Sequence, residues 1–520
     1  MQKLITASQA AQLIKDNDTI AFNGFAFGFG FPEALAKALG KRYEQEKKPE
    51  NLTLLFASGC GDSGKSDFGL DHFAQEGMVR RIVAGHVGLA KKLSGMINEN
   101  QVEAYNFPQG VITHLYRAIA GGKSGVITHV GLKTFADPRL EGGKMNEKTK
   151  EDLVEVIQVD GKEQLFYRSM PIQVALIRGT KIDEHGNMTL EKEGVYLETL
   201  HIAQAAKNSG GIVIAQAEQV VKHGSLNVRE IEIPGMLVDY IVKAEQEDHK
   251  MNAGVQYDPS YTGEAVIPVE QIEPMKMSPR KIISKRCAME LERNTIINLG
   301  IGMPEGVAAV ALEEGISDWT TMTIEAGSVG GVPGSGTNLG GATNVEVIIG
   351  HPNMFDFYDG GGLHIAFLGL AQADEKGNIN VSKFNGRMVG CGGFVNITQN
   401  TKRVVFCGTF TAGKSEIEVA DGKLVIKKDG QYKKFIKEAE QVTFSGEYAK
   451  EVGQEVLYVT ERAVFRLTEK GMELIEIAPG IDLQKDILDQ MEFEPIISKQ
   501  LKEMDSAIFK DEVMGLKDRK

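Results

Sequence analysis

Glu325 has the surroundings that most favour chemistry in this sequence. It follows Thr320 to Ile324, a run rich in β-branched residues that predicts a buried strand. A strand that ends in a single carboxylate places that acid at the carboxyl edge of a sheet, where open α/β sheets bind ligands. The residues that follow are mostly small, and the glycines among them are Gly327, Gly330, Gly331, Gly334, Gly336, Gly340 and Gly341. Glycines let another molecule approach the acid closely, although the same spacing also fits a solvated acid in a surface loop.

Two other stretches match the phosphate-loop pattern GxxxxGK[ST], Gly59 to Ser66 and Gly408 to Ser415. This pattern binds phosphate only where its Lys-Ser pair opens a helix. The residues after the second match alternate in polarity and end at Asp421-Gly422, which predicts a β-hairpin instead. Gly69 weakens the helix expected after the first match. A nucleotide-hydrolysing enzyme that uses the first match therefore remains an alternative.

Signatures of hydrolase triads and of metal sites are missing from the sequence. Ser328 lies in Ala326-Gly327-Ser328-Val329-Gly330, so the GxSxG elbow lacks its first glycine. The ten histidines form neither HExxH nor a paired metal spacing. We therefore expect no metal site.

Composition limits the classes of protein that fit. A chain of 520 residues is long enough for two domains. Its hydrophobic content of 42% and charged content of 25% are typical of globular proteins. The net charge of −13 argues against nucleic acid or an anionic membrane as a partner.

The cysteines and the apolar segments bear on the compartment. Cys60, Cys287, Cys391 and Cys407 show no disulfide framework, which fits a reducing cytoplasm. No apolar run approaches the roughly 18 residues that a membrane span requires. Met1 to Phe22 predicts a short helix followed by a strand rather than a signal peptide.

Predicted strands and helices alternate along the first half. Thr6 or Ser8 can cap a helix that runs through Ile14, and Pro32 suits the first turn of a helix from Glu33 to Leu39. The predicted strands are Thr19 to Phe22, Leu52 to Ala57, Ile82 to Ala84, Val102 to Tyr105 and Val126 to Thr128. This alternation predicts a mostly parallel sheet with helices on both faces.

The second half of the sequence repeats blocks of the first in the same order. Asp18-Thr19-Ile20 followed by Pro32-Glu33-Ala34 corresponds to Asn294-Thr295-Ile296 followed by Pro304-Glu305-Gly306. Asp183-Glu184-His185-Gly186-Asn187 corresponds to Asp374-Glu375-Lys376-Gly377-Asn378. A favourable turn sequence could explain the last pair alone. Two ordered matches predict two homologous open-sheet α/β domains in one chain.

The boundary between the two domains is expected near a proline-containing basic segment. We predict an N-terminal domain over residues 1–270, a linker over residues 271–286, and a C-terminal domain over residues 287–520 that carries Glu325. We interpret the basic cluster as part of a solvated linker, with contact to a nucleotide phosphate as the alternative. Its members are Lys276, Arg280, Lys281, Lys285 and Arg286. From Glu416 onward, alternation predicts a β-rich insertion before a final helical tail.

Six stretches, in order over essentially the whole chain, resemble the family I coenzyme A transferases. The resemblance is greatest to the acetate or propionate CoA-transferases in which both subunit types are fused. The first half contributes Asn106-Phe107-Pro108-Gln109-Gly110. The second half contributes Asn298 to Pro304, Glu325-Ala326-Gly327, Tyr358 to Gly362, Gly390 to Phe394 and Glu476 to Gly480.

The resemblance implies a role for each matching residue. Glu325 is expected to be the nucleophile that forms a glutamyl-CoA thioester, with Gln109 beside it. Gly392 or Gly393 is expected to supply backbone N–H groups to an oxyanion hole. The residues expected to contact CoA are Gly300, Ile301, Gly302 and Met303, and those expected to line the acyl pocket are Gly24, Phe25 and Phe27.

The phenylalanines of this first loop, Phe25, Phe27, Phe29 and Phe31, alternate along the chain. Their spacing predicts that they share one face of a strand or loop. Propionate-type relatives carry smaller residues here, and this departure leaves the acyl chain length open.

The implied reaction moves CoA between a short-chain acyl-CoA, such as acetyl-, propionyl- or butyryl-CoA, and a short-chain carboxylate. Covalent catalysis of this kind gives ping-pong kinetics, and it needs no net proton transfer, so a missing Ser-His-Asp set is expected. CoA would be a co-substrate and part of the covalent intermediate, with no tightly bound cofactor. The resemblance also implies a homo-tetramer or dimer. An acyl-CoA hydrolase on the same scaffold and a non-catalytic acyl-CoA sensor are alternatives.

Overall fold

The computed structural model describes residues 3–268 and 274–519. The chain forms two compact units that are discontinuous in sequence. Unit 1 comprises residues 1–266, 325–356 and 386–396, and unit 2 comprises residues 267–324, 357–385 and 397–520. The predicted boundary between residues 270 and 271 falls at residues 269–273, outside the described ranges. The linear division into residues 1–270 and 287–520 therefore stays a prediction about the two halves of the sequence.

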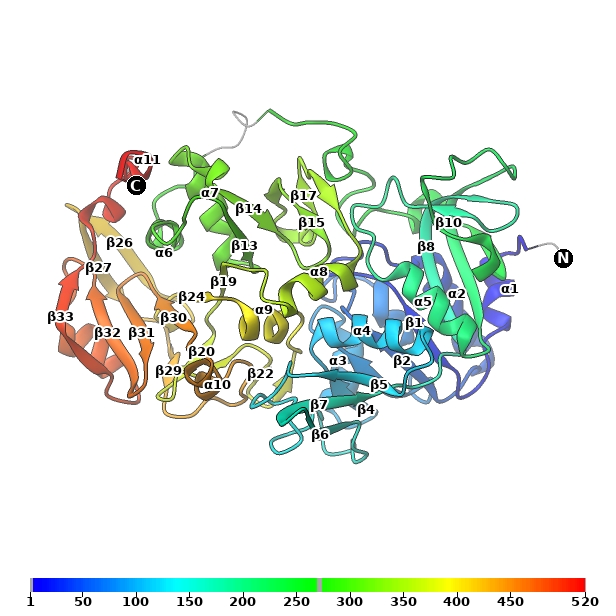
Figure 1. The fold of residues 1–520 in the computed structure, drawn as a ribbon, viewed down its shortest axis with the longest axis horizontal. Coiled ribbons are helices and arrows are strands. Elements are labelled where there is room, and N and C mark those ends of the chain that lie inside the picture. The colour runs from blue at the N-terminus through cyan, green and yellow to red at the C-terminus, as the bar shows by residue number, and fades with distance from the viewer. Residues whose placement is uncertain (1–2, 269–273, 520) are drawn as a thin grey trace. The chain divides into compact units, whose positions relative to one another are not determined.

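Unit 1 is built around a parallel sheet, in the blue to green part of Figure 1. Among the described residues, seven neighbouring strands form it. In order across the sheet, they are β4 (Glu103–Asn106), β3 (Val79–Ala84), β2 (Leu52–Phe56), β1 (Thr19–Phe22), β8 (Val174–Asp183), β10 (Ile212–Val221) and β12 (Tyr240–Lys243). Two short strands extend it beyond the end of β8, where β9 (Met188–Thr189) pairs antiparallel with β8 and β11 (Ile231–Ile233) pairs antiparallel with β9. This is the mostly parallel open sheet that the alternation predicts.

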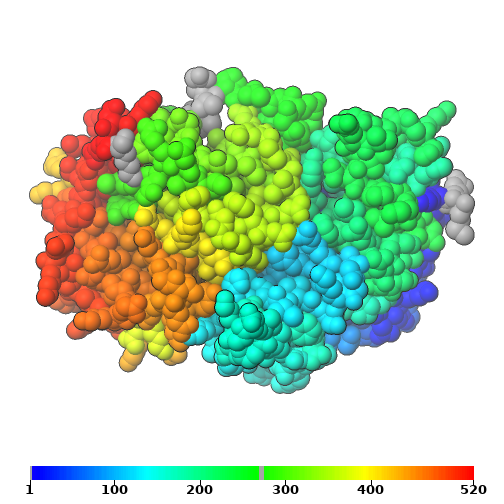
Figure 2. Space-filling model, in the orientation of Figure 1, coloured from blue at the N-terminus to red at the C-terminus, as the bar shows by residue number. Residues whose placement is uncertain are grey.

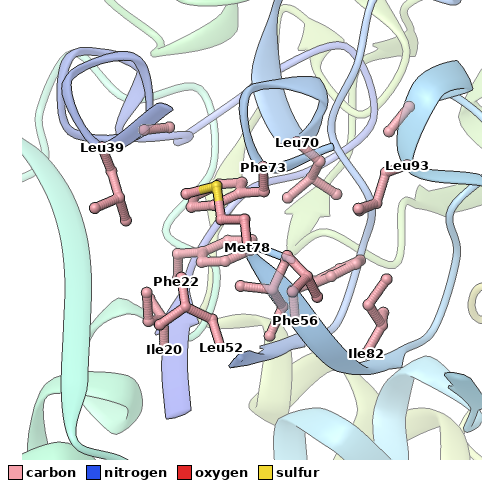
Figure 3. Close-up of a cluster of buried hydrophobic side chains, with 14 of the residues drawn as sticks. Ile20, Phe22, Leu39, Leu52, Phe56, Leu70, Phe73, Met78, Ile82 and Leu93 are labelled. Carbon is pink, nitrogen blue, oxygen red and sulfur yellow. The ribbon is translucent and has the colours of Figure 1, made fainter. Parts of the chain in front are cut away.

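Helices cover both faces of this sheet. Residues of α1 (Ala7–Gln12), α2 (Glu33–Glu46) and α3 (Lys91–Asn98) form one hydrophobic core with alternate residues of β1, β2 and β3 (Figure 3). At its centre, Phe22 stacks on Phe56 and Phe73 at centroid distances of 5.3 and 5.6 Å. On the other face, α4 (Gln109–Ala120) packs against α5 (Thr199–Asn208), which also contacts β1, β8 and β10. Because both faces are covered, the strands are apolar at consecutive positions.

The strand predicted at Val126 to Thr128 is present as β5 (Gly125–Thr128), but it lies outside the parallel sheet. It pairs antiparallel with β7 (Lys162–Arg168), which pairs antiparallel with β6 (Val154–Val159). These strands lie on the surface of unit 1, in the cyan to turquoise part of Figure 2. The half-exposed residues of β5 suit such a surface sheet better than the centre of a buried one.

The phenylalanine-rich loop after β1 is a tight turn, so the prediction that its rings share one face is wrong. The amides of Phe25 and Phe29 donate to each other's carbonyls at 2.9 and 3.0 Å. Ala26 and Gly28, at φ +48° and +102°, lie between these two residues and reverse the chain. The rings consequently diverge: Phe29 packs on Tyr261, Phe31 packs on Phe22, and Phe27 stays half-buried.

Unit 2 contains a second open sheet. Five parallel strands begin it, in the order β14 (Thr320–Thr323), β13 (Thr295–Leu299), β19 (Ile365–Gly369), β24 (Arg403–Cys407) and β30 (Glu455–Val459). It continues with β31 (Ala463–Thr468), β32 (Gly471–Ile477) and β33 (Ile496–Glu503). The predicted hairpin after Ser415 is present as β26 (Glu416–Ala420) and β27 (Lys423–Lys428). The expected helical tail is wrong, because β33 extends the sheet, and the described residues after it form only two short helices, η11 (Ser506–Phe509) and α11 (Leu516–Arg519).

The internal repeat extends to individual hydrogen bonds. In unit 1, Asp183 Oδ1 accepts the amides of His185 and Asn187 at 2.9 Å, and its Oδ2 accepts the Asn187 side chain. In unit 2, Asp374 accepts the amides of Lys376 and Asn378 and the Asn378 side chain in the same pattern. The matching turns support two homologous open-sheet domains with a β-rich insertion in the second.

The basic cluster of the predicted linker is mostly buried in unit 2, so its interpretation as a solvated linker is wrong. Residues 279–286 belong to α6 (Pro279–Ala288). Lys285 is 1% exposed and donates to the carbonyls of Lys510 and Glu512 at 2.6 and 2.8 Å. Arg286 forms a bidentate salt bridge with Glu476, with N–O distances of 2.8 and 3.0 Å. Long basic side chains can be buried where acceptors meet each charge, and residue type and spacing alone do not reveal such acceptors.

We predict that Arg286→Met destabilises the protein by about 3–5 kcal/mol, because it leaves the buried carboxylate of Glu476 without its partner. Arg403→Met is the matched control, since Arg403 pairs with Glu455, whose side chain is 67% exposed, and exposed pairs contribute at most about 1 kcal/mol. Urea unfolding of both variants measures the difference. Equal shifts of the two midpoints would contradict the assignment of a buried pair.

Candidate active site

Glu325 belongs to unit 1, as do Gln109 and Gly393. Glu325 lies two residues beyond the end of β14, at the carboxyl end of that strand, as predicted. Its Oε1 accepts a hydrogen bond of 3.2 Å from Nε2 of Gln109. Gln109 is the first residue of α4, directly after Pro108, and it is 1% exposed. The alternative of a solvated loop acid does not fit this geometry.

The Gly390–Phe394 loop is fixed beside Gln109 by Asn106, at the end of β4. Asn106 is fully buried, and its Oδ1 accepts the amide of Cys391 at 3.0 Å. Its Nδ2 donates to the carbonyls of Ala84 and Gly85, at the end of the neighbouring β3. The same loop donates from the Gly392 amide to the Gly85 carbonyl at 2.8 Å and accepts the Gln109 amide at 3.0 Å. The asparagine of Asn106-Phe107-Pro108-Gln109 thus holds the glycine loop in register with α4.

Gly393 lies against the carboxylate itself. A Cβ atom at this position would overlap with Oε2 of Glu325, so no larger residue fits without moving the acid. Among the described residues, no acceptor takes the Gly393 amide hydrogen. The Gly392 amide, in contrast, is already used by Gly85. Of the two predicted oxyanion donors, Gly393 therefore has the free N–H group beside the acid.

The glycine-rich stretch after Glu325 forms small antiparallel ladders rather than a loose loop. β15 (Ser328–Val329) pairs with β18 (Val347–Ile348), and β16 (Val332–Pro333) pairs with β17 (Ala342–Thr343). Only glycine fits at position 327, because its φ is +120° and a Cβ atom there would overlap with the carbonyl oxygen of Ile349. The ladders fix the chain on the far side of Glu325.

His351 and Glu198 complete the group, and neither was predicted from the sequence. Nε2 of His351 lies 2.9 Å from Nε2 of Gln109, and its Nδ1 lies 2.8 Å from Oε2 of Glu198. Both side chains are fully buried. His351 stands alone between Gly350 and Pro352, so it forms none of the paired histidine spacings that indicate a metal site. Its one distinguishing signal is its place at the start of α8 (His351–Asp359).

Burial raises the pKa of the Glu325 carboxyl above its usual range. The hydrogen bond from Gln109 acts in the opposite direction and lowers it. A desolvated carboxylate with few donors is poorly stabilised and is consequently a better nucleophile than one in water.

The three predicted acyl-pocket residues differ in their relation to the group around Glu325. Phe25 is 3% exposed and meets the His351 ring edge-on, with the centroids 5.9 Å apart, and Phe355 packs on the same ring at 5.1 Å. Gly24 is required by packing, since a Cβ there would lie 2.6 Å from the sulfur of Cys60. The Phe27 carbonyl accepts the Ala253 amide at 2.7 Å. Of the three, Phe25 has a ring contact with the group around Glu325.

The predicted CoA contacts Gly300 to Met303 belong to unit 2. They follow β13 and lead into the short helix η6 (Met303–Glu305), and Ile301 is 61% exposed. The Gly302 amide donates to Glu305 at 2.9 Å, and its carbonyl accepts from Arg280 at 2.7 Å.

The first phosphate-loop match lacks the required context, as does the second. Asp62 accepts the amides of Gly64 and Lys65 and the hydroxyl of Ser66, so these donors face a carboxylate of the chain. No helix begins at Ser66, and Lys65 is exposed. The second match leads into the β26–β27 hairpin.

Comparison with known proteins relates the chain to the coenzyme A transferases. A family model described as coenzyme A transferase matches residues 4–244. The caffeate CoA-transferase of Acetobacterium woodii is 49% identical over 99% of both chains. The acetate CoA-transferase YdiF of Escherichia coli K12 is 41% identical over 98% of this chain and 96% of its own.

Solved structures agree with these sequence matches. The acyl-CoA transferase YdiF of E. coli O157:H7, in a thioester complex with CoA, has a TM-score of 0.92 and 41% identity, covering 99% of this chain and 97% of its own. Its apoenzyme has a TM-score of 0.94. Full-length similarity in both sequence and fold shows that the chain belongs to the coenzyme A transferase family and is a CoA-transferase.

Proposed function

We propose that this CoA-transferase works by ping-pong transfer through a glutamyl-CoA thioester on Glu325. The observation that carries the proposal is one carboxylate held between the Gln109 amide and the bare backbone of Gly393. Glu325 is partly exposed, which supports access by an acyl group. A covalent intermediate on Glu325 divides one transfer into two similar half-reactions.

In the first half-reaction, a carboxylate oxygen of Glu325 attacks the carbonyl carbon of the acyl-CoA. The C–S bond breaks, giving CoA thiolate and a mixed anhydride with Glu325. The thiolate then attacks the glutamyl carbonyl, the bridging C–O bond breaks, and the donor acid leaves as its carboxylate. The glutamyl-CoA thioester remains, and the acceptor carboxylate reverses the sequence. The overall reaction involves no net transfer of protons.

Each of these steps passes through a tetrahedral oxyanion, which we assign to the amide of Gly393. A preorganised donor of this kind commonly contributes about 3–4 kcal/mol to the transition state. The free N–H group of Gly393 supports this assignment over Gly392. Gln109 orients the acid and carries the other contact to its Oε1.

For substrates, we propose short-chain acyl-CoA donors and short-chain carboxylate acceptors, with CoA as co-substrate rather than as a bound cofactor. The buried ring of Phe25 over His351 supports a pocket that admits only small acyl groups. We further propose that Gly300 to Met303 contact CoA, which the exposed Ile301 at the carboxyl end of β13 supports. A cytoplasmic homo-oligomer completes the proposal, and the four free thiols are consistent with that compartment.

An aromatic acid is the second candidate acceptor, because a relative with 49% identity is a caffeate CoA-transferase. Phe25, His351 and Phe355 form a cluster of rings on which an aryl group could stack. Comparing kcat/KM for acetate, propionate, butyrate and caffeate separates the two candidates. A preference for caffeate of tenfold or more would replace the short-chain assignment.

The proposed intermediate predicts a covalent label on one residue. After mixing with acetyl-CoA and borohydride, mass spectrometry should find the side chain of Glu325 reduced to its alcohol. Glu325→Ala should lose both the label and the transfer activity, because among the described residues Glu325 is the acid whose carboxylate lies against Gly393. Label on a different residue would contradict the mechanism, whereas product acid formed without an acceptor would indicate an acyl-CoA hydrolase.

Gly393→Ala should lower the rate of thioester formation by about 100-fold or more, since its methyl group displaces the Glu325 carboxylate and a donor's contribution is commonly of that size. Gly95→Ala is the matched control. Gly95 lies inside α3 with open space around it, so alanine should fit without loss of activity. Single-turnover release of CoA measures both rates, and equal rates would remove Gly393 from the site.

The raised pKa of Glu325 predicts that the acid costs stability near neutral pH. Its folded pKa lies above the unfolded value of about 4.3, so the folded state binds the proton more tightly, and stability falls as pH rises between these values. Glu325→Gln should therefore raise the melting temperature near pH 7 while abolishing transfer. The gain should shrink as the pH falls toward 4.3. Melting curves across this range check the prediction, and a gain that does not change with pH would contradict it.

A further inference from the structure

We infer that His351 and Glu198 are positioning residues that hold the Gln109 amide, and through it the Glu325 carboxylate, in one orientation. The inference rests on the proposed role of Glu325 as nucleophile. It depends on a chain of three short contacts in unit 1: Glu198 Oε2 to His351 Nδ1, His351 Nε2 to Gln109 Nε2, and Gln109 Nε2 to Glu325 Oε1.

The side-chain amide of Gln109 has two hydrogens, and each has its own acceptor. One hydrogen is donated to Oε1 of Glu325 at 3.2 Å, and the other points to Nε2 of His351 at 2.9 Å. A flipped amide would turn its carbonyl oxygen toward the carboxylate, placing two acceptors against each other. Two acceptors in the right places therefore select one of the two amide orientations.

His351 can accept from Gln109 only if its Nε2 carries no hydrogen, so the hydrogen of the neutral ring lies on Nδ1. Glu198 accepts that hydrogen at 2.8 Å and so fixes the tautomer. A ring protonated on Nε2 would set N–H against N–H and break the contact to Gln109. A carboxylate that orients a histidine in this way is a recurring device in proteins.

The backbone anchors His351 to the same turn. The His351 amide donates to the carbonyl of Leu197 at 3.0 Å, so residues 197 and 198 hold both its main chain and its ring. Leu197 has a φ of +52°, a left-handed conformation that is strained for a non-glycine residue. Phe25 and Phe355 pack on the ring itself. The turn before α5 is thus shaped to present Glu198 to this histidine.

Variants that keep or remove the acceptor at Nε2 test the inference. His351→Asn retains a donor near Nδ1 but loses the acceptor that faces Gln109, so Gln109 is no longer held toward Glu325. Single-turnover CoA release should slow by about 10- to 100-fold, the value of the hydrogen bond from Gln109 to the charged carboxylate of Glu325. His351→Gln places an amide oxygen near the Nε2 position and should recover part of that loss. Glu198→Gln should slow the step by about 3- to 10-fold. KM for acyl-CoA should change little in all three.

A double-mutant cycle separates positioning from a structural role. If His351 acts through Gln109, then His351→Asn should cause no further loss in a Gln109→Ala background. His185→Asn, at an exposed histidine of unit 1, is the matched control and should keep the full rate. Multiplicative losses in the cycle, or wild-type rates in both His351→Gln and His351→Asn, would overturn the inference. If His351→Asn does not fold, the Glu198→Gln and His351→Gln rates and their cycles with Gln109→Ala decide it.

Failure of the proposed function gives a different result. Should the wild-type protein form no borohydride-trapped label at Glu325, the nucleophile itself is wrongly assigned. Should the label form normally while the His351 and Glu198 variants keep wild-type rates, only the positioning inference fails.

Discussion

The structure depends on a carboxylate that meets bare main chain where a side chain would ordinarily be. Glu325 lies against Gly393 so closely that a single methyl group would displace it. An acid used to carry acyl groups must be accessible to a carbonyl carbon, yet shielded from water that would hydrolyse an anhydride. Backbone without a side chain meets both demands, because it fills space and still offers an N–H group.

The surrounding architecture keeps that contact in place. Strands β3 and β4 end side by side, and Asn106 joins their ends to the Gly390–Phe394 loop. Helix α4 starts at the same edge and brings Gln109 to the acid, while the ladders after Gly327 hold the opposite side. The parallel sheet thus positions the site in the usual way for open α/β sheets, at the carboxyl ends of its strands. The desolvation that results raises the pKa of Glu325. In the proposed mechanism, the reactivity of this acid therefore comes at a cost in the stability of unit 1.

Much of this could be predicted from the sequence, because it depends on local signals. The alternating elements gave the parallel sheet of unit 1, and the repeated Asp-Glu-x-Gly-Asn turns reappear with the same hydrogen bonds in unit 2. The motif resemblance brought Glu325, Gln109 and Gly393 together correctly in space. The prediction for the phenylalanines failed because Ala26 and Gly28, both at positive φ, reverse the chain. The prediction of a solvated basic linker failed because acceptors of Arg286 and Lys285 lie 190 and 225 residues later in the sequence. His351 and Glu198 could not be found for the same reason: 153 residues separate them, and only the fold brings them together.

The most direct measurement of the central claim follows oxygen through a turnover. In the proposed mechanism, the bridging oxygen of each anhydride stays with the acid that is released, so Glu325 receives an oxygen from the acceptor acid and passes it to the next donor acid. With an ¹⁸O-labelled acceptor carboxylate, the account predicts ¹⁸O in the Glu325 peptide and then in the released donor acid. Label that never enters Glu325, or donor acid that takes its new oxygen from water, would contradict it.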